Sequence, residues 1–111
     1  GRPLCKNQAV AFMLADMEIG VETARQMVIH TLQLAEAHLP YGKEAAVAKC
    51  YAGDVAFKVA GDAVQVLGGY GYSREYPVEK LLRDAKILQI YEGTNQIQRS
   101  VVAGQLLKKY H

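Results

Sequence analysis

Hydrophobic residues recur every three or four positions along most of this chain, and polar residues occupy the positions between them. This spacing places the apolar side chains on one face of an α-helix, and no strand-like alternation competes with it. Only three prolines occur, so the periodic segments between them are long. The pattern predicts helices at about 7–37, 43–67, 77–87 and 96–110, with a turn at 39–42.

The second predicted helix differs from the others because small residues dominate one of its faces. Small side chains let the backbones of two helices approach closely, so helix packing is a more common role for such a stripe than ligand binding. The stripe consists of Ala45, Ala48, Ala52, Gly53, Ala56, Ala60, Gly61 and Ala63.

Residues with helix-capping chemistry stand at the ends of the predicted helices. Asn7 is a plausible N-cap of the first helix, and Gly68-Gly69 suits the stop of the second. The glycine-rich segment 68–73 is predicted to be a loop. Asn95 followed by Gln98 fits a capping box at the start of the last helix. The sequence therefore predicts an all-α fold, with three long helices and one short helix in an antiparallel up-and-down helical bundle.

Length and composition restrict the classes of function. A chain of 111 residues with 50% hydrophobic residues predicts one domain with a modest core. Its net charge of +2 comes from scattered basic residues, which argues against a nucleic-acid surface. The longest apolar runs are too short for a membrane span, and no signal peptide is apparent. Cys5 and Cys50 read as reduced intracellular thiols, and the three histidines do not form a metal-ligand pattern with them.

Glu92 is the candidate catalytic residue, because no Asp or Glu follows it in the sequence and its neighbours are mostly apolar or amide residues. A carboxylate before a helix N-terminus is stabilised by the helix dipole by about 0.3–1 kcal/mol, and local spacing alone favours this role. The alternative is a general base, whose pKa the neighbours Ile90, Tyr91 and Ile97 would raise. A single carboxylate suits proton abstraction next to a carbonyl better than glycoside hydrolysis, which uses a pair.

The remaining polar features favour structural roles. The segment 68–73 fails the dinucleotide-binding pattern, because Arg74 stands where its third glycine belongs. Arg83-Asp84 is expected to support packing, and Glu79 lies at the right spacing to pair with Arg83. Taken one at a time, the glutamines are expected to be solvated; they are Gln8, Gln65, Gln96 and Gln98.

Three longer runs carry more information than these local rules. They are QVLGGYGY at 65–72, YPVEKLLRDAK at 76–86 and IYEGTNQIQR at 90–99. In this order and spacing, together with Gly1-Arg2-Pro3-Leu4 and Gln8, they strongly resemble the C-terminal helical domain of the acyl-CoA dehydrogenases. The resemblance covers essentially the whole chain.

The resemblance implies a flavoenzyme that binds FAD and an acyl-CoA thioester. Glu92 matches the base that removes the α-proton while a hydride leaves the β-carbon for flavin N5. The resemblance therefore favours the role of general base over that of a charge stabilised by the helix dipole. Substrate-binding residues would be Tyr91, Glu92 and Gly93. Residues that match FAD contacts are Gln8, Gln65, Val66, Leu67, Gly68, Gly69, Gly93, Thr94, Asn95 and Gln96.

Complete members of that family also have an N-terminal helical domain, a middle β-domain and a further helix before this region. The resemblance therefore implies a fragment of a larger enzyme, lacking the first helix of its bundle. We expect the isolated chain to bind little FAD, to lack dehydrogenase activity and to expose an apolar groove.

Partners and compartment follow from the same resemblance. It implies an electron-transfer flavoprotein as acceptor, a homotetramer, and a bacterial cytoplasm or mitochondrial matrix. Acyl-chain preference stays open, since 76–99 looks medium-chain-like and 101–107 short-chain-like. The alternative is a non-catalytic assembly or binding module on the same scaffold, which would not need to keep Glu92 in its intact motif.

Overall fold

The structure, a computed structural model, describes residues 1–110 and contains only helices and turns within them. The predicted all-α antiparallel fold is confirmed. Three 3-10 turns accompany the helices: η1 (Leu4–Lys6), η2 (Ile87–Gln89) and η3 (Lys108–Tyr110). The α-helices are α1 (Gln8–Glu36), α2 (Gly42–Leu67), α3 (Gly69–Tyr72), α4 (Val78–Lys86) and α5 (Asn95–Leu107).

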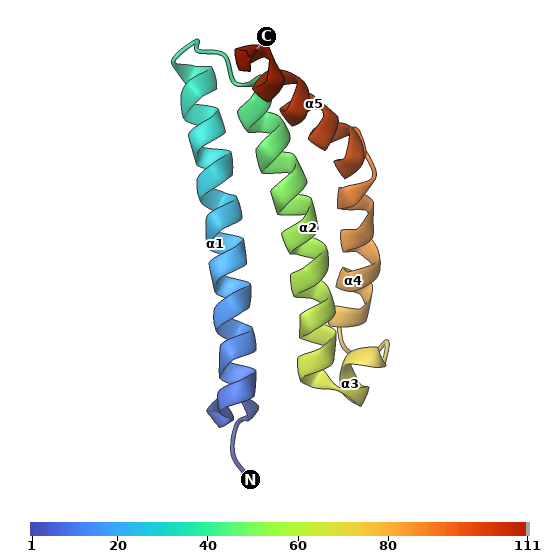
Figure 1. The fold of residues 1–111 in the computed structure, drawn as a ribbon. Helices are drawn as coiled ribbons and strands as arrows, with labels where there is room; N and C mark the ends of the chain where they lie inside the picture. Colours follow the sequence, from blue (N-terminus) through green and yellow to red (C-terminus); the bar gives the residue numbers. More distant parts are fainter. Residues whose placement is uncertain (111) are drawn as a thin grey trace.

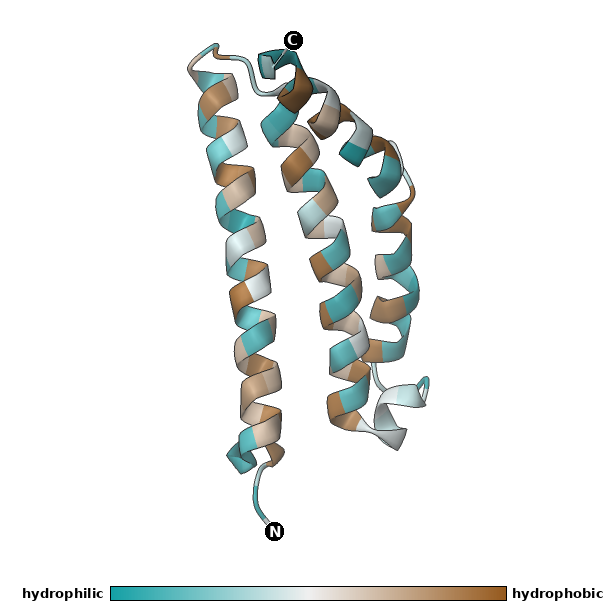
Figure 2. Cartoon of the chain, in the orientation of Figure 1, coloured by the Kyte–Doolittle hydropathy of each residue, from teal (hydrophilic) through white to brown (hydrophobic). Residues whose placement is uncertain are grey.

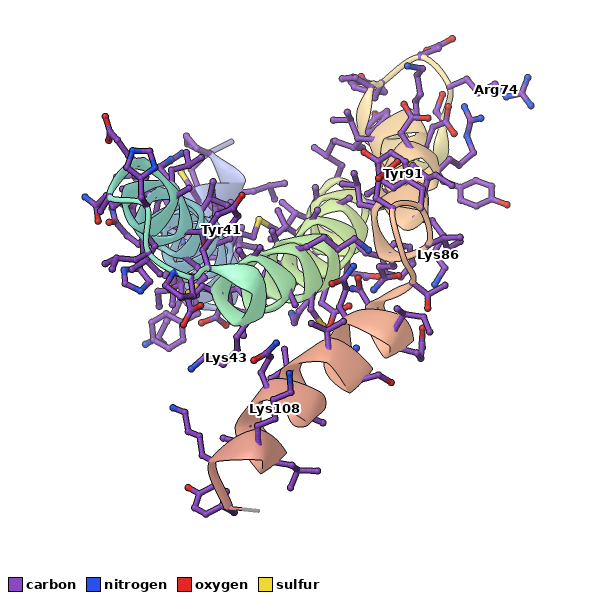
Figure 3. The ribbon with its side chains drawn as sticks, turned by 90° about the horizontal axis from the view of Figure 1, so that it is seen from above. Tyr41, Lys43, Arg74, Lys86, Tyr91 and Lys108 are labelled. Carbon is purple, nitrogen blue, oxygen red and sulfur yellow. The ribbon has the colours of Figure 1, made fainter. Side chains whose placement is uncertain are left out.

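Helix α2 is the centre of the structure (Figure 1). Helix α1 packs antiparallel along one side of it, while α4, η2 and α5 return along another side. Seen from above, α1 and α4 lie on opposite sides of α2, and α5 runs along a third side (Figure 3). Every segment that returns along the bundle is therefore positioned by its contact with α2.

Small residues occupy the helix contacts, as the stripe on α2 predicts. Within residues 1–110, the buried positions are alanines and glycines together with a single polar residue, Asn95. Contact is closest at Gly71, where an added Cβ would lie 2.5 Å from the Val64 carbonyl oxygen. The buried small residues are Ala24, Ala46, Ala48, Gly53, Gly71 and Ala85.

The chain leaves much apolar surface uncovered. Its accessible surface is 8015 Å², against roughly 6,100 Å² for a typical folded monomer of 12.2 kDa. Hydrophobic residues accordingly appear on outward faces of every long helix (Figure 2). Between α2 and α4 they line an apolar groove of about 430 Å³, which includes Val59, Ala60, Val78 and Leu81. Such a groove was expected from the sequence.

The structure confirms the position of one predicted cap, without its hydrogen bond, and corrects two other predictions. Asn7 stands at the N-cap position of α1 but caps no backbone N–H, and its Oδ1 instead accepts a hydrogen bond from Arg2. Segment 68–73 is largely helical, because α3 forms immediately after the left-handed Gly68. The N-cap of α5 is Thr94, whose hydroxyl accepts the Ile97 N–H at 3.2 Å. Asn95 does not cap this helix, because its side chain is turned into α2.

Candidate active site

Glu92 lies in a tight turn between η2 and α5. Its φ of +55° is the left-handed conformation that a side chain with a Cβ adopts at a cost of about 1–2 kcal/mol. Gly93 follows with φ of +86°. Glu92 is exposed, and so are Ile90, Tyr91 and Ile97, so this chain by itself does not provide the apolar shielding suggested by the sequence. Tyr91 lies on the α4 side of the molecule, across α2 from α1 (Figure 3).

The turn is fixed by hydrogen bonds to both of its carbonyl groups. Gln98 Nε2 donates to the Glu92 carbonyl oxygen at 3.0 Å. Lys49 Nζ, from α2, donates to the Gly93 carbonyl oxygen at 2.8 Å. The Thr94 cap then starts α5 directly after the turn. The backbone that carries Glu92 is thus held from α5 on one side and from α2 on the other.

Asn95 links this turn to the middle of α2. It is only 2% exposed. Its Nδ2 donates to the Cys50 carbonyl oxygen at 3.1 Å and to Asp54 Oδ1 at 2.8 Å. Its Oδ1 accepts a hydrogen bond from Lys49 Nζ at 2.7 Å. Both N–H groups and the oxygen of the amide are therefore bonded to α2.

Asp54 gathers three segments around one carboxylate. Besides the Asn95 amide, it accepts hydrogen bonds from Gln89 Nε2 at 2.9 Å and from Arg99 Nη2 at 2.9 Å. Partial burial acts to raise the pKa of Asp54, but the hydrogen bonds from Asn95, Gln89 and Arg99 outweigh it and lower that pKa below its usual range. Asp54 is therefore ionised at neutral pH and connects η2, the start of α5 and the second turn of α5.

Gly53 allows α2 to approach the turn so closely. A Cβ at this position would lie 2.9 Å from the Leu88 carbonyl oxygen and 3.2 Å from Asn95 Nδ2. Only hydrogen fits in this space. The glycine in the small-residue stripe thus serves the site as well as helix packing.

The residues that match FAD contacts fall into two separate groups. Gln8 and Gln65–Gly69 lie at the end of the bundle where α1 begins and α2 ends (Figure 1). Gly93–Gln96 lie beside the middle of α2, since Asn95 contacts Gly53. Gly53 and Gln65 are separated by about 18 Å along the helix axis, at 1.5 Å per residue. The fold therefore does not bring the two groups together within one chain.

The residues of these two groups differ in how accessible their side chains are to a ligand. The side chains of Gln8, Gln65 and Gln96 are exposed, whereas Val66 and Leu67 are half-buried. Gly68 needs its lack of a Cβ because its φ is +59°. The amide of Asn95 is turned inward and already bonded to α2, so this side chain is not free for a ligand.

The other candidate residues lie away from the turn. Arg83 pairs with Glu79, as predicted, through two hydrogen bonds of 2.9 and 3.1 Å. Asp84 pairs with Lys80, so Arg83 and Asp84 do not pair with each other. Within residues 1–110, no cluster of His, Cys, Asp and Glu has the geometry to hold a metal ion; His111 lies outside the described residues. None of the described helices is long and apolar enough to cross a membrane.

Lys49 and Asp54 were not identified from the sequence. A signal was present, because Lys49 and Asp54 are two of the four charged residues that fall within the small-residue stripe, and they lie on either side of Gly53. Charges at such positions are rarely tolerated without partners. Their partners lie 35 to 46 residues further along the chain, so spacing alone could not reveal them.

Comparison with known proteins identifies the family of this helical domain. Residues 1–107 match the family model described as the acyl-CoA dehydrogenase C-terminal domain. An acyl-CoA dehydrogenase of Bacillus subtilis is 55% identical over 107 residues, which cover 96% of this chain and 28% of that protein.

Two solved structures extend the likeness to the fold. Butyryl-CoA dehydrogenase from Megasphaera elsdenii superposes with a TM-score of 0.93 at 51% identity, covering 96% of this chain and 28% of that one. A chain from a study of the electron transferring flavoprotein of Acidaminococcus fermentans superposes with a TM-score of 0.94 at 52% identity, covering 97% and 28%.

The chain therefore belongs to the acyl-CoA dehydrogenase family and corresponds to its C-terminal helical domain. It spans about a quarter of the length of the curated relatives that it matches.

Proposed function

We propose that this chain is the C-terminal helical domain of a longer, FAD-dependent acyl-CoA dehydrogenase in which Glu92 is the catalytic base. The observation that carries the proposal is the Glu92 turn itself. It presents an exposed carboxylate on a backbone fixed from two helices, within a chain of this family. A base held in one place favours proton transfer, because the reacting atoms need little further ordering.

In the proposed reaction, the Glu92 carboxylate takes the proton from the α-carbon of the thioester. The electron pair of that C–H bond forms the double bond between the α- and β-carbons, and a hydride leaves the β-carbon. Bound FAD supplies the acceptor for this hydride. Tyr91 and Gly93, on either side of Glu92 in the sequence, would flank the thioester.

The residues present fit FAD in part. Exposed amides at Gln8, Gln65 and Gln96, and the accessible backbone at Gly68-Gly69, can hydrogen-bond the cofactor's polar groups. The Asn95 side chain does not fit this role, since its bonding capacity is taken by α2. The distance between the two groups supports contacts with two different flavins, one of them held by another subunit. A flavin shared between subunits requires an oligomer, which we propose to be a homotetramer, and it predicts little FAD binding and no activity for the isolated chain.

The named relatives support a choice of substrate and acceptor for testing. The M. elsdenii relative is a butyryl-CoA dehydrogenase, which makes short-chain thioesters the first substrates to examine. The A. fermentans chain comes from a study of an electron transferring flavoprotein, which supports a protein of that class as acceptor.

Flavin reduction by saturated acyl-CoAs tests the proposal in the complete enzyme that contains this chain. Glu92→Gln keeps the shape of the side chain but removes its basicity. Reduction by butyryl-CoA should slow by about 10²–10⁴-fold, the usual contribution of a general base. Glu18→Gln, on an exposed face of α1, is the matched control and should react as the wild type does. Near-normal reduction in Glu92→Gln would remove Glu92 from the role of base.

A further inference from the structure

Asn95 is the only polar residue among the buried positions of residues 1–110. Burying an amide side chain destabilises the folded state unless all of its polar atoms are hydrogen-bonded. Here they are, and all three partners belong to neighbouring turns of α2: Lys49, Cys50 and Asp54. The side chain is thus a fixed connection between α2 and the start of α5.

Lys49 extends this connection to the turn that carries Glu92. Its ammonium group donates both to Asn95 Oδ1, at 2.7 Å, and to the Gly93 carbonyl oxygen, at 2.8 Å. One charged donor therefore sets the backbone immediately after Glu92 relative to the buried amide. Hydrogen bonds from a charged donor are about twice as strong as neutral ones.

Asp54 fixes the other side of the turn. It holds Gln89, three residues before Glu92, and the Asn95 amide, three residues after it. The left-handed Glu92 and Gly93 lie between these two anchors. A strained conformation persists only when its surroundings determine it from several sides, and the two anchors meet that condition.

We propose that Asn95, through Lys49 and Asp54, is a positioning residue that holds the Glu92 carboxylate in its reactive place, and that its side chain is not a contact for the cofactor. The inference rests on the proposed role of Glu92. Its chemical consequence is specific. Loss of the amide leaves the base present but misplaced, so the turnover rate falls while substrate and flavin still bind. A misplacement of about 1 Å costs about 10²-fold in rate.

The test uses the complete enzyme with bound FAD and butyryl-CoA as substrate. Asn95→Leu keeps the volume of the side chain and removes its hydrogen bonds. We expect kcat to fall by about 10- to 100-fold, with KM and the flavin content per subunit close to those of the wild type. Gln105→Leu, an exposed amide further along α5, is the matched control and should leave all three quantities unchanged.

Lys49→Met is the second variant, because Asn95→Leu could also fail to fold. It leaves the buried amide in place and breaks its link to the Gly93 carbonyl. It should lower kcat in the same way, with Lys109→Met in η3 as its control. If Asn95 and Lys49 act as one unit, the double variant should be no slower than the slower single variant, because coupled sites are not additive.

The outcomes separate the two proposals. Normal reduction in Glu92→Gln overturns the base, and the positioning role falls with it. If flavin reduction is slow in Glu92→Gln but kcat is that of the wild type in both Asn95→Leu and Lys49→Met, the positioning role alone is overturned. Loss of flavin from Asn95→Leu, with normal kcat per flavin retained, would show that Asn95 is a cofactor contact. If the decreases in kcat of the two single variants multiply in the double variant, Asn95 and Lys49 do not act as one unit.

Discussion

The Lys49 ammonium group lies 2.8 Å from the carbonyl oxygen of Gly93, 44 residues further along the chain. This contact joins the central helix to the turn that carries Glu92. The proposed base is therefore positioned by α2, although it lies between η2 and α5 in sequence.

Gly53→Ala should destabilise the protein and disturb the Glu92 turn. The added Cβ would lie 2.9 Å from the Leu88 carbonyl oxygen, which belongs to the backbone and cannot rotate away. Overpacking of this kind costs about 1–3 kcal/mol. The thermal midpoint of the complete enzyme should fall, and flavin reduction should slow with it.

Gly61→Ala is the matched control on the same helix. Its added Cβ would meet only Leu82 Cδ1 at 3.8 Å, an ordinary contact. Alanine is favoured over glycine within a helix by about 0.5–1 kcal/mol, so this thermal midpoint should stay level or rise. Equal effects of the two substitutions would contradict the close contact at Gly53.

Glu92→Gly should be more stable than Glu92→Ala by roughly 1 kcal/mol, because glycine adopts the left-handed conformation without the penalty of a Cβ. Both variants lack the carboxylate and should be inactive. Thermal midpoints of the paired variants measure the difference. The same pair at Glu18, inside α1, should show the opposite order, since glycine is unfavourable within a helix.

Asp54 should make the free energy of unfolding depend on pH in the acid range. Its folded-state pKa is lowered from 3.8, so its contribution is fully present above that value and is lost as the pH falls through the lower, folded-state pKa. Far-UV circular dichroism of the chain during acid titration measures the loss. Asp54→Asn should be less stable at neutral pH by about 1–3 kcal/mol, and should lack this component of acid unfolding.

Asp62→Asn is the control for the acid titration. Asp62 lies on the same helix and pairs with Lys58 in an exposed ion pair, which contributes little to stability. Its acid unfolding should follow that of the wild type. An acid transition that is unchanged in Asp54→Asn would mean that the hydrogen bonds to Asp54 do not contribute to stability.

Thr94→Val should weaken the start of α5 by about 1 kcal/mol, the usual worth of an N-cap. The Ile97 N–H would lose its acceptor beside the Glu92 turn. Thr23→Val provides the comparison. Thr23 donates to the Ile19 carbonyl within α1, a bond that adds little to a helix. Thermal midpoints that fall equally would show that Thr94 does not act as the cap.

Much of the fold could be predicted because its signals are local. The boundaries of α1 and α2 follow from hydrophobic spacing, and the pairing of Glu79 with Arg83 from their separation by four residues. The cap of α5 could not be chosen locally, because Thr94 and Asn95 are both good capping residues. The choice depended on α2, whose Lys49 and Asp54 bond the Asn95 amide.

The sequence by itself determined the longer helices, the family and the candidate base, since periodic spacing and the motif around Glu92 are properties of neighbouring residues. Only the tertiary structure decided how that base is held. The contacts between Lys49 and Gly93, and between Asp54 and Asn95, join residues more than 40 positions apart. Such contacts depend on the close packing of α2 at Gly53. The small-residue stripe predicts close packing there, but no local pattern specifies which segment packs against it.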